Sequence, residues 1–542
     1  MPRYYTELTP VADIRELITV RAAAAGDRLA FAERLSRDEL HEICFTDFAA
    51  DVAALGTELL ARSRAARPAT ARQPHIAVIG ENSCAWVTAC FAAICSGFVA
   101  VPLDNSLGAE QLAGQLAHSD SDLLFCSRAH YEALQQLPSP PRIPLHPLDE
   151  LDSLIASGRA AIAAGDRSYE EVTVSPQQMA AIFYTSGTTG SSKGVILSHA
   201  NICAVVNANR DKYIAHGATL AVLPFHHAYG FVVAILMVYN EGHSVFINAG
   251  LHSILHDLRA ARPTAMAVVP LFIEFFHRRI MDTVRRQGRE KSLAFALKLS
   301  RILRFLKIDL RRRLFSTIHR QFGGRLVDLI CGGAPMDPEY VRFFEQIGIN
   351  VINGYGITEC SPVVAVDDKY NPRPGTTGTP LSCCSVRIAA DGEIMVSGES
   401  VFSGYYRDAE ATEASLVNGE FATGDLGRLD AEGYLTITGR KKNLIILANG
   451  ENVSPEEIEM ELARDSAVQE VLVVEQDRRI VAYVFPTEAF LGNTEHFSTL
   501  RRVYNAAAQP AKRIAEIILR DCEFEKNSAR KILRHKVLQP AP

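Results

Sequence analysis

One segment in the first half of the chain gathers residues that bind phosphate. Residues 185–194 read Thr-Ser-Gly-Thr-Thr-Gly-Ser-Ser-Lys-Gly, which places three glycines, six hydroxyls and one lysine in ten positions. Glycine lets backbone amides turn toward an anion, hydroxyls donate hydrogen bonds, and Lys193 adds a mobile positive charge. The segment directly follows an apolar run at residues 179–184, which is typical of a strand. We therefore predict a phosphate-binding loop at the end of a strand.

This loop differs from the P-loop of kinases and GTPases. The P-loop pattern needs a glycine directly before the lysine and a Ser or Thr directly after it, whereas this chain has Ser192 and Gly194 there. A flexible surface loop would also be rich in Gly and Ser, but it would not be expected directly after a strand. The segment is therefore predicted to hold phosphate in another way.

Two further motifs exclude common alternatives. Residues 224–230 contain the adjacent pair His226 and His227, whose side chains would point in opposite directions on a strand. No HExxH pattern accompanies them, so we expect no metal site at these histidines. Residues 354–359, Gly-Tyr-Gly-Ile-Thr-Glu, lack the third glycine of a dinucleotide-binding fingerprint, which excludes a Rossmann site.

The motifs occur in the order found in the adenylate-forming superfamily of acyl-CoA synthetases, luciferases and peptide-synthetase adenylation domains. The chain resembles this superfamily over roughly residues 30 to 540, and its long-chain fatty acid–CoA ligases most closely. The motifs that carry the resemblance are the signature loop (184–195), the aromatic gate motif (224–230), a loop beside the nucleotide (332–335), the adenine motif (354–359), the ribose motif (423–427), the hinge (439–442) and the catalytic-lysine motif (528–534).

The resemblance implies a set of nucleotide-binding residues. The loop residues would hold the leaving phosphates, Tyr355 would stack on adenine, and Asp425 with Arg440 would bind the ribose hydroxyls. The full set is Thr185, Ser186, Gly187, Thr188, Thr189, Gly190, Lys193, Gly333, Ala334, Pro335, Gly354, Tyr355, Gly356, Thr358, Asp425 and Arg440.

The same resemblance gives catalytic roles to Lys531, His227, Thr185 and Glu359, and it makes Lys442 the hinge. Lys531 would bridge the carboxylate and the α-phosphate, where a flexible ammonium can follow the developing charge. Glu359 would hold Mg²⁺ against the phosphates, with hydroxyls from Thr358 or Thr185. His227 would be the gate beside the acyl site, and Lys442 would be the hinge.

Each of these residues also has an ordinary structural explanation. Tyr355 stands between two glycines, which suits an exposed ring, although most tyrosines pack in a core. Asp425 follows Gly424 in a predicted tight turn, where an aspartate commonly caps the turn. Glu359 fits a helix cap or a buried pair, His227 a core position, and Lys531 a solvated surface.

The resemblance implies that ATP activates a carboxylic acid to an acyl-adenylate, with release of pyrophosphate and transfer to a thiol. Residues 225–239 are apolar and offer no Asp for an α-ammonium group, which favours a medium- or long-chain fatty acid over an amino acid. The acceptor is CoA or, alternatively, the phosphopantetheine of an acyl carrier protein. A non-catalytic nucleotide-binding sensor is the alternative from another class.

Apolar runs and helical segments alternate through the first two-thirds of the chain, which is typical of layered α/β structure with parallel strands. Short strands with frequent Gly and Asp follow. The expected fold is a large α/β N-terminal domain (1–441) with a small β-rich subdomain (364–438), and then a smaller, mobile α+β lid domain (442–542). Ser454, Pro455 and Glu457 predict a capping box at the start of a helix.

Composition limits the partners. The 542 residues are 48% hydrophobic and carry a formal net charge of −6, so a nucleic-acid partner is not expected. The basic and apolar stretch at 276–323 predicts amphipathic helices, either as a solvated face or as a site for acidic lipid or thiol-substrate phosphates. We expect at most peripheral membrane contact. Eleven cysteines without a CxxC pair, and no secretory signal, predict a cytoplasmic location.

Overall fold

The computed structural model of the chain describes residues 9–36, 39–66, 72–185, 192–213, 215–369, 372–447, 451–526 and 532–537. The chain divides into two compact units. Unit 1 comprises Met1–Ser385 and Val396–Phe421, and unit 2 comprises Val386–Met395 and Ala422–Pro542. The domain boundary expected from the sequence, at residue 441, stays a prediction.

The larger sheet of unit 1 has nine strands in the described ranges, in the order β15-β14-β13-β12-β11-β9-β10-β1-β2. Its centre is parallel from β13 to β1, and antiparallel strands lie at both edges. The strands are β1 (Leu29–Arg34), β2 (Leu40–Cys44), β9 (Thr219–Ala221), β10 (Val245–Ile247), β11 (Ala265–Val268), β12 (Asp328–Cys331), β13 (Asn350–Tyr355), β14 (Ala365–Val366) and β15 (Thr379–Pro380).

The second sheet of unit 1 has seven strands among the described residues, in the order β18-β8-β7-β4-β3-β5-β6. The strands from β7 to β6 are parallel, whereas β8 and β18 are antiparallel additions at one edge. The strands are β3 (His75–Ile79), β4 (Val99–Pro102), β5 (Leu123–Cys126), β6 (Leu145–Pro147), β7 (Met179–Thr185), β8 (Lys193–Ser198) and β18 (Gly404–Tyr405).

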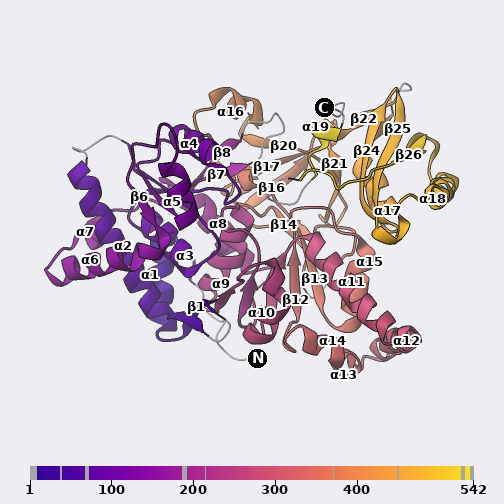
Figure 1. Cartoon of the computed structure of the whole chain (residues 1–542), viewed down its shortest axis with the longest axis horizontal. Helices are drawn as coiled ribbons and strands as arrows, with labels where there is room; N and C mark the ends of the chain where they lie inside the picture. Colours follow the sequence, from indigo (N-terminus) through magenta and orange to yellow (C-terminus); the bar gives the residue numbers. More distant parts are fainter. Residues whose placement is uncertain are drawn as a thin grey trace. The chain divides into compact units, whose positions relative to one another are not determined.

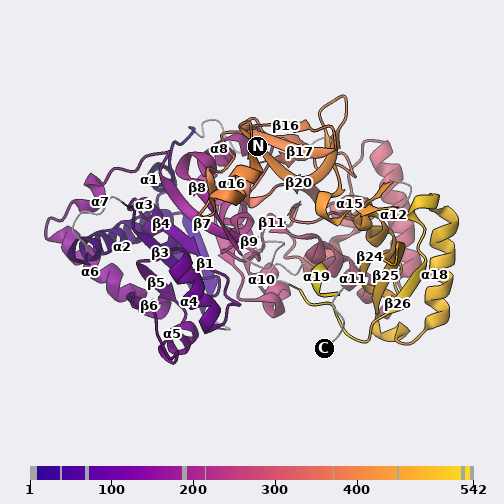
Figure 2. The same ribbon diagram turned by 90° about the horizontal axis from the view of Figure 1, so that it is seen from above.

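Helices cover the sheets of unit 1, and α2 and α6 lie side by side (Figures 1 and 2). They are α1 (Ile14–Ala25), α2 (Phe45–Ala66), α3 (Cys84–Cys95), α4 (Ala109–His118), α5 (Arg128–Gln135), α6 (Leu151–Ala163), α7 (Ser168–Glu171), α8 (His199–Asn209), α9 (Met237–Asn240), α10 (Ile254–Ala261), α11 (Pro270–Arg286), α12 (Glu290–Phe305), α13 (Arg311–Leu314), α14 (Ser316–Gln321), α15 (Pro338–Ile347) and α16 (Ala409–Ser415).

The helix α3 shows how the sequence specifies these elements. The side chain of Ser83 accepts a hydrogen bond from the amide of Trp86 at 3.1 Å, which caps the helix N-terminus. From Cys84 to Cys95 nearly every side chain is buried, as expected for a helix that is apolar on all sides. The predicted alternation of buried strands and helices is confirmed, because the apolar runs at 75–80, 98–104 and 179–184 form β3, β4 and β7.

A five-stranded sheet in the described part of the chain has the order β16-β17-β20-β19, and β21 pairs with β20. Unit 2 contains a described three-stranded sheet, β24-β25-β26, packed with α17 and α18. The elements are β16 (Cys384–Ile388), β17 (Glu393–Gly398), β19 (Leu416–Val417), β20 (Glu420–Leu429), β21 (Leu435–Arg440), β22 (Ile445–Ile446), β23 (Asn452–Val453), β24 (Val468–Gln476), β25 (Arg479–Pro486), β26 (Glu516–Leu519), α17 (Pro455–Leu462), α18 (Thr494–Ala507) and α19 (Arg534–Val537).

The start of α17 corrects one expectation. Ser454 is at the N-cap and Pro455 opens the helix as predicted, but the Ser454 side chain makes no capping hydrogen bond. Its hydroxyl donates instead to a carboxylate oxygen of Glu456 at 2.8 Å. The predicted capping box is therefore wrong: the Ser454 side chain turns to Glu456, and the carboxylate of Glu457, its predicted partner, accepts from Lys512 instead.

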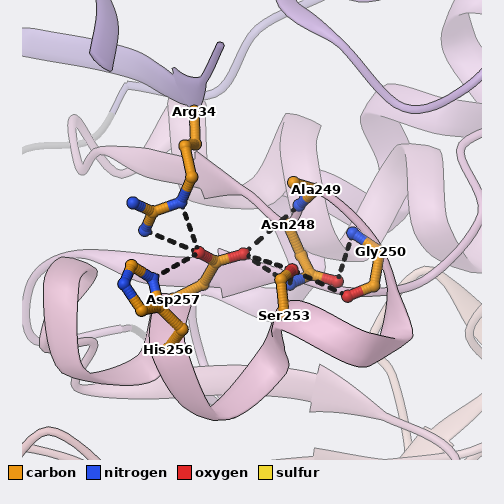
Figure 3. A network of polar contacts seen from close by, with 7 residues as sticks. All are labelled: Arg34, Asn248, Ala249, Gly250, Ser253, His256 and Asp257. Atoms are coloured by element: carbon orange, nitrogen blue, oxygen red, sulfur yellow. Dashed lines mark hydrogen bonds and ion pairs between the residues drawn. The ribbon is translucent and has the colours of Figure 1, made fainter. Parts of the chain in front are cut away.

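A buried polar network fixes the loop after β10 (Figure 3). The guanidinium of Arg34 in β1 contacts the carboxylate of Asp257 in α10 at 2.7 Å, and Ser253 and Asn248 donate to the same carboxylate at 2.8 Å each. Burial by itself favours the neutral acid, but the hydrogen bonds from Ser253, Arg34 and the Ala249 amide hold the pKa of Asp257 below its usual value. The surrounding hydrogen bonds thus stabilise the charged form of the Asp257 carboxylate.

All eleven cysteines lie among the described residues, and none of them forms a disulfide bond there. Most of them are buried, and burial raises the pKa of thiols such as Cys90 and Cys203. In the ranges that the structure describes, none of the helices combines the length and the apolar content needed to cross a membrane.

Candidate active site

The two ends of the predicted phosphate loop lie on neighbouring antiparallel strands. Thr185 closes β7 and Lys193 opens β8, and the two residues are directly paired. Of the expected contacts, Ser186, Gly187, Thr188, Thr189 and Gly190 lie outside the described residues.

A cluster in unit 1 joins this loop to the predicted adenine motif. The ammonium of Lys193 lies over the ring of Tyr405, 4.7 Å from its centroid. The hydroxyl of Tyr405 donates a hydrogen bond to a carboxylate oxygen of Glu359 at 2.8 Å. Burial raises the pKa of Tyr405, and the adjacent Glu359 raises it further, so the phenol keeps its proton and remains a donor.

Glu359 is only 7% exposed and belongs to a short 3₁₀ turn, Thr358–Cys360, that follows β13. The turn is placed by close packing of the preceding chain, since a side chain on Gly356 would come within 1.7 Å of the carbonyl oxygen of Pro362. This packing fixes where the carboxylate lies, and Tyr405 links it to Lys193. A carboxylate with an adjacent Thr358 hydroxyl is an oxygen donor set that fits Mg²⁺.

The predicted gate motif forms a tight loop between β9 and a π-helical segment over Tyr229–Leu236. Gly230 closes the loop, because a side chain there would lie 2.2 Å from the carbonyl oxygen of Pro224. Asn82, which follows β3 in the other sheet, donates to the carbonyl of Leu223 at 2.8 Å and accepts from the amide of Phe225 at 3.0 Å. Asn82, which follows a strand of a different sheet, thus fixes the backbone of the gate loop on both sides of Pro224.

The two histidines of this loop do not diverge as expected. The ring centroids of His226 and His227 are 4.3 Å apart, because the chain turns here and forms no strand. His226 lies 3.6 Å from a carboxylate oxygen of Asp104, whereas burial and His227 both lower the pKa of His226. Of the pair, His226 is therefore mostly neutral at physiological pH. The gate role of His227 stays a prediction.

The residues predicted to surround the base follow β12 and lie in β13. Gly333, Ala334 and Pro335 form an exposed loop directly after β12. Tyr229 supports this end of the sheet, since its hydroxyl donates to the carbonyl of Ile330 at 2.9 Å.

Tyr355 ends β13 next to Gly354 and is 8% exposed, so the exposed ring suggested by its flanking glycines is not observed. The strand packs this ring against the interior, which local sequence does not reveal. The contact of Gly354, Tyr355, Gly356 and Thr358 with a nucleotide stays a prediction.

In unit 2, the predicted ribose-binding residues are paired with each other. The guanidinium of Arg440 contacts the carboxylate of Asp425 at 2.9 Å, and the two residues face each other across β20 and β21. Asp425 lies inside a ten-residue strand, so the expected tight turn is wrong. Gly424 has a φ of 70°, and its amide donates to Glu393 at 2.8 Å, which bends the strand before the aspartate.

The last two predicted residues also belong to unit 2. Lys442 is exposed in a 3₁₀ turn, Lys441–Asn443, directly after β21. Desolvation lowers the pKa of Lys442, and Arg440 acts in the same direction. Lys531 lies outside the described residues.

Three polar residues in these clusters were missed by sequence reasoning, namely Tyr405, Asn82 and Glu393. Tyr405 is 46 positions from Glu359, and Asn82 is 141 positions from Leu223, so no local spacing links them. The position of Asn82 directly after a buried strand was the one available signal, because loops at that end of a sheet carry ligand-binding groups.

Comparison with known proteins gives these clusters a family context. The AMP-binding enzyme family matches residues 18–406, and the AMP-binding enzyme C-terminal domain matches residues 442–540. A long-chain-fatty-acid–CoA ligase of Mycobacterium bovis is 28% identical over 431 residues, which are 74% of this chain and 70% of the relative.

A peroxisomal long chain acyl-CoA synthetase of Arabidopsis thaliana is 30% identical over 69% of this chain, and this chain spans 59% of its length. In fold, the chain is similar to O-succinylbenzoate coenzyme A synthetase of Bacillus subtilis in complex with ATP and magnesium. That match has a TM-score of 0.71 and 23% identity, and it covers 96% of this chain and 99% of the other. The expected α/β fold class and the resemblance are confirmed: the chain belongs to the AMP-binding enzyme family.

Proposed function

We propose that the chain is an AMP-forming acid–thiol ligase that activates a medium- or long-chain fatty acid and transfers the acyl group to CoA. The observation that carries the proposal is the cluster of Lys193, Tyr405 and Glu359. It joins one end of the phosphate loop to the carboxylate after β13, through distances of 4.7 and 2.8 Å. Tyr405 thus connects a cation with an acid inside unit 1.

In the proposed first half-reaction, a carboxylate oxygen of the acid attacks the α-phosphorus of ATP. The bond from that phosphorus to the bridging oxygen breaks, and pyrophosphate leaves with the electron pair. Lys193 and the loop hydroxyls hold the departing phosphates, and Lys531 neutralises the charge that develops at the α-phosphate. Mg²⁺, held by Glu359 with Thr358 or Thr185, would supply further positive charge to the phosphates.

Nucleotide binding is proposed for the remaining predicted residues. Asp425 accepts hydrogen bonds from the ribose hydroxyls, and Arg440 keeps that carboxylate oriented through their 2.9 Å contact. Gly333, Ala334 and Pro335 offer an exposed backbone to the nucleotide, and Tyr355 with its neighbours flanks the base.

The apolar segment after the gate supports a fatty acid. Phe231, Val232 and Ile235 follow His227 in a buried π-helical segment, where an alkyl chain would meet no charged group of that segment. The related ligases of Mycobacterium bovis and Arabidopsis thaliana are named for long-chain substrates.

In the proposed second half-reaction, the thiol sulfur attacks the acyl carbonyl carbon, and AMP leaves as the thioester forms. We propose residues 442–542 as the lid domain and Lys442 as the hinge, so that two faces of the lid serve the two half-reactions. Residues 1–441 would then form the adenylating domain. A cytoplasmic location also stays a prediction.

The test measures pyrophosphate release with acids from acetate to palmitate and with aryl acids, each with CoA and with a phosphopantetheinylated carrier protein. We expect release that depends on a fatty acid, and a fatty acyl-CoA product identified by mass spectrometry. Thioester formation on the carrier protein alone would reject CoA as acceptor. ATP binding without acid-dependent release would indicate a nucleotide sensor and reject the ligase.

A further inference from the structure

The helix α12 exposes large apolar side chains to solvent. The exposed fractions are 89% for Phe305, 68% for Phe295, and 58% for both Ile302 and Leu306. Single exposed apolar residues are common on soluble proteins, but contiguous groups of them mark interaction sites. Four such residues within twelve positions form a contiguous group, which we name the α12 face.

Helical geometry places these residues on one side of α12. At 100° per residue, Phe295, Ile302, Phe305 and Leu306 fall within an arc of about 100°. Ser300 lies on the opposite side, is 1% exposed, and donates to the carbonyl of Gln346 in α15 at 2.9 Å. The helix therefore packs on unit 1 through one side and presents its apolar side to solvent. Figure 1 shows α12 beyond α11, away from β12 and β13.

The charge of the same segment is strongly one-sided. Residues 291–308 contain five basic residues and no acidic residue, although the whole chain has a net charge of −6. All five basic side chains are exposed: Lys291, Lys298, Arg301, Arg304 and Lys307. By the same geometry, Lys291 and Lys298 lie within the arc of the α12 face and Arg301 borders it, whereas Arg304 points toward the α15 side, where it acts on Glu345. Positive charge therefore lies among and beside the apolar residues.

This combination selects among possible partners. A second copy of the chain would bring Lys291, Lys298 and Arg301 against the same three charges, which disfavours a symmetric dimer through this face. Nucleic acid would match the charge but would leave four large apolar side chains without a contact. A bilayer with anionic headgroups matches both, since the apolar side chains enter the boundary of the acyl chains and the basic ones meet the headgroups.

We propose that the α12 face docks unit 1 onto the surface of bilayers that contain anionic lipid. The contact is peripheral, with α12 parallel to the membrane plane. Of the alternatives that the sequence left open for the 276–323 stretch, the proposal selects acidic lipid and names the residues that contact it. The docking does not depend on the proposed ligase activity, so either can fail without the other.

The test is flotation of the full-length protein with vesicles of phosphatidylcholine alone or with about one-third phosphatidylglycerol, at low and high salt. We expect binding to the anionic vesicles that weakens with salt, and much weaker binding to the neutral ones. Phe295→Gln/Phe305→Gln should lower the partition coefficient about 10-fold. Lys298→Gln/Arg301→Gln should lower it about 30-fold on anionic vesicles.

Matched controls come from α18 of unit 2, where Val503 is 61% exposed and Arg502 is also exposed. Val503→Gln and Arg502→Gln should leave the partition unchanged, and circular dichroism should show that all variants fold. Equal binding to neutral and anionic vesicles, or binding unaffected by both double variants, would overturn the proposal. Self-association in sedimentation velocity that the phenylalanine variants abolish, without vesicle binding, would instead assign the face to a second copy.

Discussion

Two buried carboxylates, one in each unit, have opposite kinds of partner. Glu359 in unit 1 is 7% exposed and accepts a hydrogen bond from the neutral hydroxyl of Tyr405. Asp425 in unit 2 is 4% exposed and contacts the guanidinium of Arg440 at 2.9 Å. The two carboxylates are therefore buried to a similar degree, but Tyr405 is a neutral partner and Arg440 is a charged one.

This difference suggests that the two carboxylates bind different groups. Tyr405 orients Glu359 without bringing a positive charge of its own, which leaves the carboxylate suited to attract a cation such as Mg²⁺. Arg440 offsets the charge of Asp425, which leaves that carboxylate suited to accept hydrogen bonds from neutral hydroxyls. The five predictions below test whether partner charge separates the roles of buried acids in this chain.

The largest effect is expected for Glu359→Gln. The amide keeps the shape and can still accept from Tyr405, but it removes the negative charge, so adenylation should slow about 10³-fold. Pyrophosphate release measured against Mg²⁺ concentration checks this, and Glu399→Gln, an exposed position, is the control. A rate near that of the unchanged protein would remove Glu359 from the proposed metal site.

Asp257→Asn tests a buried acid that has a charged partner and lies outside the predicted nucleotide motifs. It leaves the guanidinium of Arg34, which contacts Asp257 at 2.7 Å, without its counter-charge, and should lower the free energy of unfolding by about 3 kcal/mol. Urea unfolding measures the loss.

The control for this variant is Asp149→Asn, in an exposed pair with Arg128, which should cost less than about 1 kcal/mol. The turnover of folded Asp257→Asn protein should change little. An unchanged urea midpoint would show that the network in Figure 3 contributes nothing to stability.

Asp425→Asn should act on nucleotide affinity more than on turnover. Loss of a charged acceptor should raise the Kd for ATP about 10- to 100-fold, because hydrogen bonds to charged groups are the stronger ones. Calorimetric titration measures this. Asp430→Asn is the control, since Asp430 accepts hydrogen bonds from the Glu432 and Tyr434 amides of its own turn. Unchanged ATP affinity in Asp425→Asn would contradict the ribose role.

Tyr405→Phe removes the hydroxyl that orients Glu359 and keeps the ring beneath Lys193. The expected loss in kcat is about 10-fold, the size of one ordinary hydrogen bond. Tyr406→Phe is a close control, because the neighbouring tyrosine hydroxyl donates to Asp120 at 2.7 Å instead. If both variants behave alike, the proposed positioning by Tyr405 is wrong.

Glu241 extends the comparison to pH. Burial raises the pKa of Glu241 from 4.5 to about 8, while the amide of Ala215 and the charge of Lys369 oppose this only in part. The unfolded chain releases this proton near pH 4.5 and the folded chain near pH 8, so stability should fall as the pH rises between these values.

The slope from Glu241 is at most about 1.4 kcal/mol per pH unit. Glu241→Gln should flatten this part of the stability profile, which urea midpoints at several pH values will show. A decline of the same steepness in the variant would mean that another group causes it.

Much of the fold could be predicted from the sequence, because strand and helix patterns are local. The runs that form β3, β4 and β7, and the ends of the phosphate loop at Thr185 and Lys193, follow from spacing alone. The local structure at His226 and Asp425 could not be predicted. His226 was expected on a strand but lies in a turn, and Asp425 was expected in a turn but lies in a long strand.

The partners of the site residues depend on contacts between distant parts of the chain. Tyr405 reaches Glu359 across 46 positions, and no short motif contains both residues. The sequence likewise could not predict which side of α12 faces solvent, because an amphipathic pattern does not say which apolar residues the rest of the fold covers. Ser300 settles that point through its contact with Gln346.

The most direct test of the ligase proposal is acid-dependent exchange of radioactive pyrophosphate into ATP, compared between the unchanged chain and Lys531→Ala. The account predicts exchange with fatty acids and a loss of about 10² to 10³ in the variant, because one charge-stabilising group is removed. Exchange that does not depend on any acid, or that is undiminished in Lys531→Ala, would contradict it.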